Sequence, residues 1–319
     1  MTRREWFQNS GVLLAGTLLA KLTPDVILAS AQQPNAKVDA VRASRAKMAA
    51  LPIEAAYLTD HLTLLSGPGG NVVVLHGPDG KLIVDTFVAP AWPQLKQHLD
   101  GLGEAPLHNA INTHWHFDHT DNNAQVRAIG AVILAHENTK KRLSEPHDLA
   151  PLGMHFDPAP ADALPQKTFA TTDTFDFNGE TLTLGHIPPA HTDSDIFIHF
   201  QMANVLHAGD VFFNGLYPFI DGGTNGSVHG MIQGATQLIA LADADTRIVP
   251  GHGPLGDRAA LVRFRDMLAE VYDNVEKQKA AGQSVKEVVA SKPSARFDAD
   301  WGKGLNSPDF FVELVYNTL

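Results

Sequence analysis

Cysteine is absent from the 319-residue sequence. No disulfide can form, and any metal site has to use histidine, aspartate or glutamate side chains. An excess of positive charge is also absent, because 24 Lys and Arg residues face 35 Asp and Glu residues and leave a formal net charge of -11. An acidic chain repels phosphate backbones, so we expect no nucleic-acid partner.

Long apolar runs are missing as well. Residues 12–20 form an apolar run that is too short to cross a bilayer, which takes about 20 residues, so we expect no stable membrane span. The run follows Arg3 and Arg4 and precedes Ala-Ser-Ala at 29–31, which is the layout of an export signal. Residues 2–7, TRREWF, also resemble the twin-arginine export motif. We therefore predict cleavage after Ala31 and a periplasmic or secreted mature protein.

The remaining sequence has no repeats and no low-complexity tract. Residues 32–55 are polar and rich in alanine, which predicts a linker or loosely helical extension. Strand-like runs at 57–65, 71–75 and 81–85 surround a Gly-Pro-Asp-Gly turn, and an Asn-Gly turn at 178–179 separates the strand-like segments 175–177 and 181–184. The sequence therefore predicts at least two β-hairpins.

Helical patterns alternate with these strands. We expect a helix at 92–99, a strand at 109–113 that ends at His114, and a helix at 118–129. In the last third, Asp257 precedes a helical pattern with apolar residues at steps of three and four, and Ser-Pro-Asp at 307–309 begins another helix. Hairpins mixed with helices predict an α+β fold with two sheets covered by helices, a four-layer sandwich over one catalytic domain at 56–319. The pattern predicts neither the strand order nor an oligomeric state.

The decisive motif is Thr-His-Trp-His-Phe-Asp-His-Thr at 113–120. In an extended segment, His114 and His116 point the same way because side chains alternate with period two, so both can bind one ion. A turn into a helix at Asp118 would redirect Asp118 and His119 toward a second point a few Å away. Imidazole and carboxylate both suit zinc.

Three later residues complete the candidate metal ligands. His191, Asp210 and His252 each lie where a strand-like run gives way to a loop rich in glycine or proline, a common place for functional side chains. His186, five residues before His191, is a competing candidate for the third histidine.

Together these motifs resemble the metallo-β-lactamase fold superfamily over residues 56–256, and they follow the family's order. One departure is Ala190, where the family more often has glycine. The resemblance implies an αββα sandwich with the site at one edge and two zinc or other divalent ions. The implied ligands are His114, His116 and His191 for one ion; Asp118, His119 and His252 for the other; and Asp210 between them. Asp85 matches a family aspartate that would orient a ligand histidine, although it could also be a carboxylate that only ends its strand.

Such a site implies a hydrolase in which a hydroxide bridging the two metal ions attacks a carbonyl, with Asp118 as both ligand and proton carrier. The leading hypothesis is β-lactam ring opening, which agrees with export. A bridging aspartate is unusual for the best-known lactamases, so lactone and glyoxalase II-like thioester hydrolysis are the enzymatic alternatives. A periplasmic metal-binding protein without activity is a further alternative. For the small-molecule substrate, Trp115, Phe213 and Tyr217 are candidate contacts, with ordinary core packing as the competing interpretation.

Overall fold

Two β-sheets face each other in the computed structural model, which describes residues 34–319. The predicted export signal at 1–31 lies outside these residues. The first sheet has seven strands in the order β1-β2-β3-β4-β5-β6-β9. Its strands are β1 (Glu54–Tyr57), β2 (Leu62–Ser66), β3 (Asn71–Gly77), β4 (Gly80–Val84), β5 (Leu107–Ile111), β6 (Val132–His136) and β9 (Lys167–Phe169).

The second sheet has six strands that follow one another in chain order. They are β10 (Thr172–Phe177), β11 (Glu180–His186), β12 (Ile196–Phe200), β13 (Val205–His207), β14 (Arg247–Val249) and β15 (Gly256–Asp257). The Asn178-Gly179 hairpin is confirmed, because both residues adopt the positive φ angles, 53° and 74°, that a tight hairpin turn requires. A separate two-stranded hairpin consists of β7 (His147–Leu149) and β8 (Met154–Phe156).

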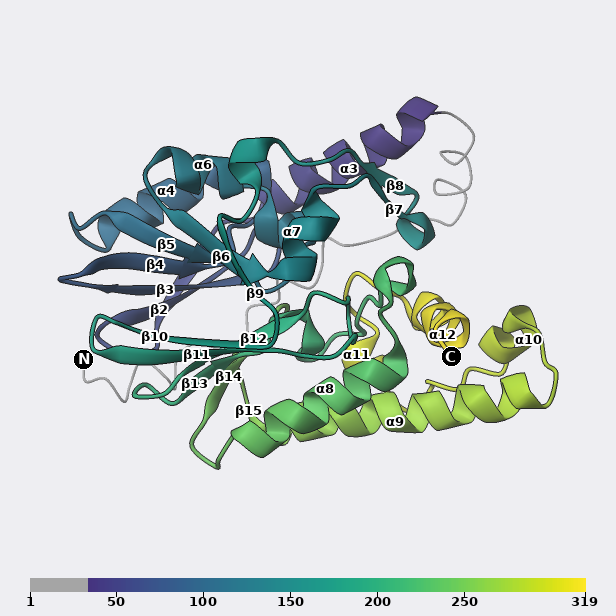
Figure 1. Ribbon diagram of the computed structural model, residues 1–319. Helices are drawn as coiled ribbons and strands as arrows, with labels where there is room; N and C mark the ends of the chain where they lie inside the picture. The colour runs from purple at the N-terminus through teal and green to yellow at the C-terminus, as the bar shows by residue number, and fades with distance from the viewer. Residues whose placement is uncertain (1–33) are drawn as a thin grey trace.

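Helices cover the outer faces of both sheets, so the predicted α+β fold is confirmed (Figure 1). On the first sheet lie α4 (Trp92–Gly101), α6 (Asn123–Ala128) and α7 (Glu137–Leu143). Under the second sheet lie α8 (Val228–Leu241) and α9 (Arg258–Ala280). The remaining helices are α3 (Pro34–Ala49), α5 (Phe117–Thr120), α10 (Val285–Ala290), α11 (Asp298–Trp301) and α12 (Pro308–Asn317).

The core between the sheets is built from apolar residues of both inner faces, including Val73, Leu82, Leu184 and Ile198, all fully buried. Strand β4 is buried along its whole length because helices cover its other face. Edge strand β10 instead alternates exposed and partly buried positions. A second apolar cluster packs α8, α9 and α12 against the second sheet. These layers hold the loops at one edge of the sandwich in fixed positions.

The chain around the histidine motif differs from the predicted pattern. Instead of one helix at 118–129, two short helices, α5 and α6, are separated at Asn122. The side chain of Asn122 donates hydrogen bonds to the carbonyls of Thr86 and Val88, at 2.6 and 2.9 Å, and so fixes the end of β4 to this break. The preceding strand, β5, ends at Ile111, because the amide of Thr113 donates to a carboxylate in the loop after β4.

The segment predicted as a linker or loose helix contains a regular helix, α3. Arg45 forms two hydrogen bonds of 2.6 Å with the carboxylate of Asp121, just after the histidine motif. Lys37 pairs with Asp148 of β7 at 3.2 Å. These charged contacts, together with the burial of Val41 in an apolar cluster shared with the first sheet, hold a helix whose sequence shows little amphipathic pattern.

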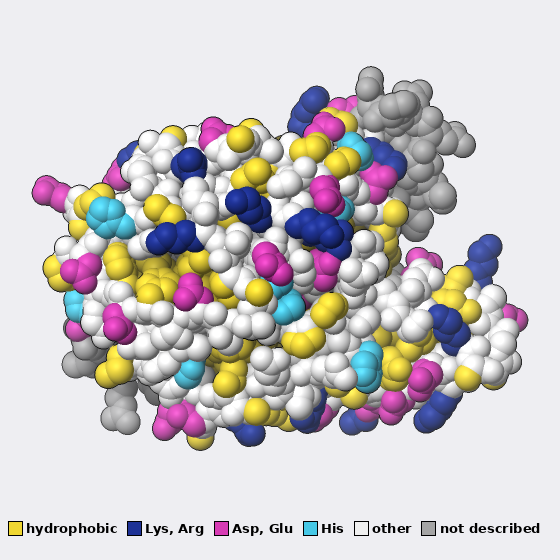
Figure 2. All heavy atoms as spheres, viewed as in Figure 1, with side chains coloured by type: hydrophobic (Ala, Val, Ile, Leu, Met, Phe, Trp, Pro, Cys, Tyr) yellow, Lys and Arg dark blue, Asp and Glu magenta, His cyan; other side chains and the backbone are white. Residues whose placement is uncertain are grey.

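Within residues 34–319, none of the helices combines the length and apolar character that a bilayer crossing demands. The face shown in Figure 2 has basic and acidic side chains interspersed.

Candidate metal centre

Separate loops at one edge of the sandwich bring the candidate ligands together. The histidine motif runs from the end of β5 into α5. His191 follows β11, Asp210 lies in a short 3₁₀ helix after β13, and His252 follows β14. The five histidines and two aspartates predicted as ligands form two neighbouring groups of possible metal-binding side chains.

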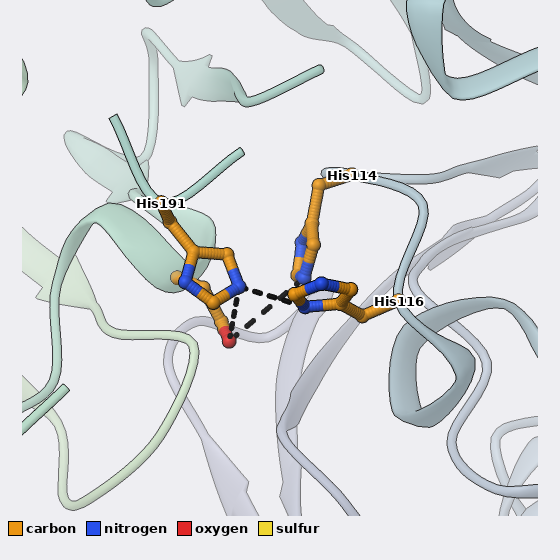
Figure 3. A group of neighbouring side chains, drawn as sticks. His114, His116 and His191 are labelled. Atoms are coloured by element: carbon orange, nitrogen blue, oxygen red, sulfur yellow. Dashed lines mark hydrogen bonds and ion pairs between the residues drawn. The ribbon is translucent and has the colours of Figure 1, made fainter. Parts of the chain in front are cut away.

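The first group contains His114, His116, His191 and Asp210, whose ligand atoms all lie within 4.8 Å of one another. The labelled rings of His114, His116 and His191 point toward one another in Figure 3. His191 Nε2 lies 2.8 Å from His116 Nδ1 and 3.4 Å from Asp210 Oδ2. His186 does not join this group, because its ring stacks on His136 at 3.9 Å.

The second group contains Asp118, His119 and His252. His252 Nε2 lies 3.3 Å from Asp118 Oδ2 and 3.4 Å from His119 Nε2. Asp210 also reaches this group, with Oδ1 3.2 Å from His119 Nε2 and Oδ2 3.3 Å from His252 Nε2. The carboxylate of Asp210 therefore lies between the two groups.

The chemistry of these side chains fits divalent cations. His114 Nε2 and Asp210 Oδ1 are buried and have no hydrogen-bond partner among the described residues, which is costly unless a ligand satisfies them. Burial and the neighbouring His119 hold the pKa of His114 well below its usual value, and burial lowers the pKa of His191 to about 4. Both rings are therefore neutral at pH 7 and offer lone pairs, as metal ligands must.

The carboxylates of the cluster are ionised. Burial opposes ionisation of Asp210, but the charges of His252 and His119 hold its pKa well below the usual value. Burial likewise raises the pKa of Asp118, whereas His119 and His252 lower it more, to about 2. Carboxylate oxygens beside imidazole nitrogens form the donor set that zinc prefers.

Outer partners orient four of the five histidines through the ring nitrogen that faces away from the cluster. His119 Nδ1 lies 2.7 Å from Asp85 Oδ2, and Asp85 also accepts hydrogen bonds of 2.7 Å from the amide and hydroxyl of Thr113. The Thr113 hydroxyl then accepts from His114 Nδ1 at 3.0 Å. His191 Nδ1 donates to the carbonyl of Phe219 at 2.8 Å. Such partners fix the tautomer and direction of a ligand ring.

Sequence reasoning missed Asp221, the outer partner of His116. Asp221 Oδ2 lies 3.3 Å from His116 Nε2, and it accepts a 2.5 Å hydrogen bond from the hydroxyl of Thr224. Asp195 was also missed, although its carboxylate accepts from the amides of His191 and Thr192 at 2.8 and 2.9 Å. The only local signal was the pair of acidic residues in Thr-Asp-Ser-Asp, immediately after His191. Asp221 is distant in sequence from the histidine that it contacts and offered no signal.

Two glycines allow the backbone to approach the cluster closely. A Cβ atom on Gly251 would lie 1.9 Å from Asp210 Oδ1, and one on Gly70 would lie 2.5 Å from a ring carbon of His119. A side chain at either position would displace a candidate ligand. Position 251, just before His252, is therefore a glycine because any side chain there would meet the carboxylate of Asp210.

The three residues predicted to contact substrate lie in different surroundings. Trp115 packs its ring 4.7 Å from that of His116, and Phe213 stacks on His252 at 5.1 Å. Tyr217 is only 1% exposed, its ring stacks on Phe311, and its hydroxyl donates to Asp298 at 2.8 Å. Tyr217 therefore belongs to the core beneath α12, and we no longer expect it to contact substrate.

Comparison with known families agrees with this fold and site. The sequence profile of the Metallo-beta-lactamase superfamily matches residues 65–252, which is more than half of the chain and spans both groups of candidate ligands. The chain belongs to the metallo-β-lactamase superfamily, whose members are metal-dependent hydrolases. A search of curated proteins gives no significant match.

Solved structures show the same fold at low sequence identity. A metallo-beta-lactamase from Pontibacter korlensis is 18% identical, with a TM-score of 0.57 over 68% of this chain and 99% of that one. The DIM-1 metallo-beta-lactamase is 18% identical, with a TM-score of 0.53 over 69% of this chain and 98% of that one. A double mutant of the sec-alkyl sulfatase PisA1 is 14% identical, with a TM-score of 0.61 over 92% of this chain and 54% of that one.

Proposed function

We propose that this protein binds two zinc ions and hydrolyses a carbonyl substrate, with β-lactam ring opening as the leading reaction. The observation that supports the two-ion site is the position of Asp210, whose oxygens lie 3.2 to 3.8 Å from histidine nitrogens of both groups. A carboxylate between two sets of ligands is suited to bridge two cations a few Å apart. His114, His116 and His191 would hold one ion, and Asp118, His119 and His252 the other.

When bound, divalent ions supply the Lewis acidity that activates water and polarises a carbonyl group. The protein supplies the proton transfer. Asp118 is ionised at neutral pH, since its pKa is lowered to about 2, so it can accept a proton from the attacking water. Asp118 would then deliver the proton to the departing nitrogen, oxygen or sulfur. Asp85 and Asp221 would hold His119 and His116 in the orientation that the site requires.

The charges near the site argue for a slow β-lactamase. Many β-lactams carry a carboxylate that a free Lys or Arg would anchor. Two arginines close to the site are already paired, because Arg45 binds Asp121 and Arg142 binds Asp193. Trp115 and Phe213 lie beside His116 and His252 but are only 3% and 5% exposed, so they offer little apolar surface to a flat ring. We therefore expect kcat/KM below about 10⁴ M⁻¹s⁻¹ for penicillins and cephalosporins.

One observation favours a second candidate, the hydrolysis of a sulfate ester. The similarity to the sec-alkyl sulfatase structure covers 92% of this chain, whereas the similarity to the lactamases covers 68% or 69%. A match of that extent must include helices of the last third of the chain, which lie beyond the family match at 65–252.

A hydrolysis screen tests the proposal. Zinc-loaded protein is assayed against a chromogenic cephalosporin, a penicillin, an acyl lactone, a thioester and a secondary alkyl sulfate. We expect β-lactam turnover that chelation abolishes and zinc restores, and that the His186→Ala control retains. Turnover of only the lactone, thioester or sulfate would refute the assignment as a lactamase and would support the broader assignment as a hydrolase. If no substrate is turned over although two ions bind, the protein is a metal-binding protein and the enzymatic proposal is wrong.

We also propose that residues 1–31 direct export and are removed. The support is the arginine pair, the short apolar run and the Ala-Ser-Ala sequence described above. Export of a folded protein would suit a chain that takes up its metal before crossing the membrane.

A further inference from the structure

His252 differs from the other four histidines of the cluster. Each of those has a hydrogen-bond partner for the ring nitrogen that faces away from the cluster, whereas within residues 34–319 no such partner contacts His252. The His252 ring is held on one face by Phe213, which stacks at 5.1 Å with an angle of 12° between the planes. Apart from this stacking and the contacts of its Nε2 within the cluster, the ring is positioned by the backbone that carries it.

Asn71, a distant residue at the start of β3, contacts the backbone around His252, whose Gly251 amide also donates to the carbonyls of Gly209 and Phe212 at 2.7 and 3.0 Å. The side-chain amide of Asn71 donates to the carbonyls of Pro250 and Gly253, both at 2.9 Å. Its backbone amide donates to the carbonyl of Gly251 at 2.7 Å. The remaining carbonyl of the segment, that of His252, accepts from the amide of Asn214 at 2.9 Å. Asn71 thus provides three of the four hydrogen bonds that fix the carbonyls on both sides of His252.

The orientation of the Asn71 amide is chemically determined. Its oxygen accepts a 2.6 Å hydrogen bond from the hydroxyl of Ser66, and the opposite orientation would direct that oxygen at two carbonyl oxygens. Asn71 is only 3% exposed, so water cannot replace these bonds without opening the loop. Because an aspartate or a serine has no pair of N–H donors, neither could reproduce this arrangement.

We propose that Asn71 is a positioning residue for the metal centre: it clamps the 250–253 loop and thereby sets the location of His252. Asn71 would touch neither substrate nor metal and would act only through His252. This inference rests on the two-ion site proposed above. Asn71 belongs to the first sheet, whereas His252 follows a strand of the second sheet. The position of this candidate ligand therefore depends on how the two sheets pack.

The first test measures metal affinity. In a competition titration with a zinc chelator, Asn71→Ala should lower the affinity for one ion by about ten- to a hundredfold. This is the scale of effect for outer partners of metal ligands. The other ion should lose clearly less affinity, because His114, His116 and His191 lie outside this loop and only Asp210, against which Gly251 packs, is shared. Asn274→Ala is the matched control, since it also removes an amide-to-carbonyl bond, to Pro293, far from the site.

Ser66→Ala is a milder variant that removes only the bond orienting the Asn71 amide, and it serves if Asn71→Ala does not fold. Ser66→Ala should lower the affinity for the same ion by a smaller factor. In the His252→Ala background, Asn71→Ala should change that ion's affinity by less than about twofold, because residues that act as a unit are not additive. Equal weakening of both ions, or a lower melting temperature with both affinities unchanged, would overturn the proposal.

A metal-independent measurement separates this inference from the proposed function. In the metal-free protein, Asn71→Ala should accelerate hydrogen exchange at the amides of Gly251 and Asn214 at least tenfold, because the loop then opens locally. Asn274→Ala should leave both amides protected. If the wild-type protein binds fewer than two ions while these amides respond as expected, the two-ion proposal fails and the clamp stands. If the exchange rates do not change, the clamp itself is refuted.

Discussion

Asp210→Asn tests the two-ion site most directly. Asparagine has nearly the shape of aspartate, so the close packing of Gly251 against this side chain is kept. The negative charge between the two groups is lost, and one oxygen is replaced by an NH₂ group that cannot bind a cation. Because Asp210 is 4% exposed and contributes no apolar packing, the fold should survive.

Two magnitudes follow from the structure. For the metal-loaded protein, we expect affinity for at least one ion to fall by about a hundredfold or more, at the upper end of the effects seen for outer partners. This corresponds to about 2.7 kcal/mol, and kcat/KM should fall by a similar factor. Binding of a single ion in place of two would be the clearest outcome.

The metal-free protein should respond through His252. Burial lowers the pKa of His252, but Asp210 and Asp118 outweigh burial and raise the pKa from 6.5 to about 9. A raised pKa stabilises the folded state fully below about pH 6.5, and this stability is lost as the pH rises through about 9. At about 1.36 kcal/mol per pH unit the wild-type loss is roughly 3 kcal/mol. Because Asp118 shares the effect, Asp210→Asn should remove about half of it.

Urea unfolding of chelated protein between pH 6 and 10, together with zinc titration at pH 7, measures both effects. A variant that binds two ions with wild-type affinity would refute the bridging role of Asp210. Unchanged pH dependence in the metal-free variant would show that Asp210 does not control the protonation of His252.

Three further predictions concern single residues and the N-terminus. His191→Ala should abolish binding of one ion, whereas His186→Ala should leave both affinities near normal; titration of each variant with zinc decides, and the reverse pattern would mean that His186 is the ligand. Asp221→Asn should weaken the ion held by His116 about tenfold, because the amide can turn its NH₂ toward His116 Nε2 and no longer fixes the ring; equal weakening of both ions would argue for a general structural role. Mass spectrometry of exported protein should find a chain that begins after residue 31, and a chain that keeps Arg3 and Arg4 would contradict the export signal.

The local sequence was sufficient to predict the chemistry of the motif at 113–120. Ligand types are set by residue identity, and a strand-to-helix junction constrains where neighbouring side chains point. The Asn178-Gly179 hairpin and the Asp257-capped helix α9 were predicted for the same reason, because turns and caps are short-range interactions. The family resemblance added the later ligands in their order. It implied His191 rather than His186 as the third histidine, a choice that the residue pattern alone left open.

Only the tertiary structure determined which residues support the ligands. Asn71 and His252 are far apart in sequence, as are His116 and Asp221, and no local pattern connects them. The break of the predicted helix at Asn122 depends on carbonyls of the loop after β4. The sequence by itself determined the candidate metal-binding side chains, because ligand chemistry is a property of single residues. Their orientation and their outer partners were decided by how the two sheets pack, because hydrogen bonds between distant loops form only once the folded backbone brings those loops together.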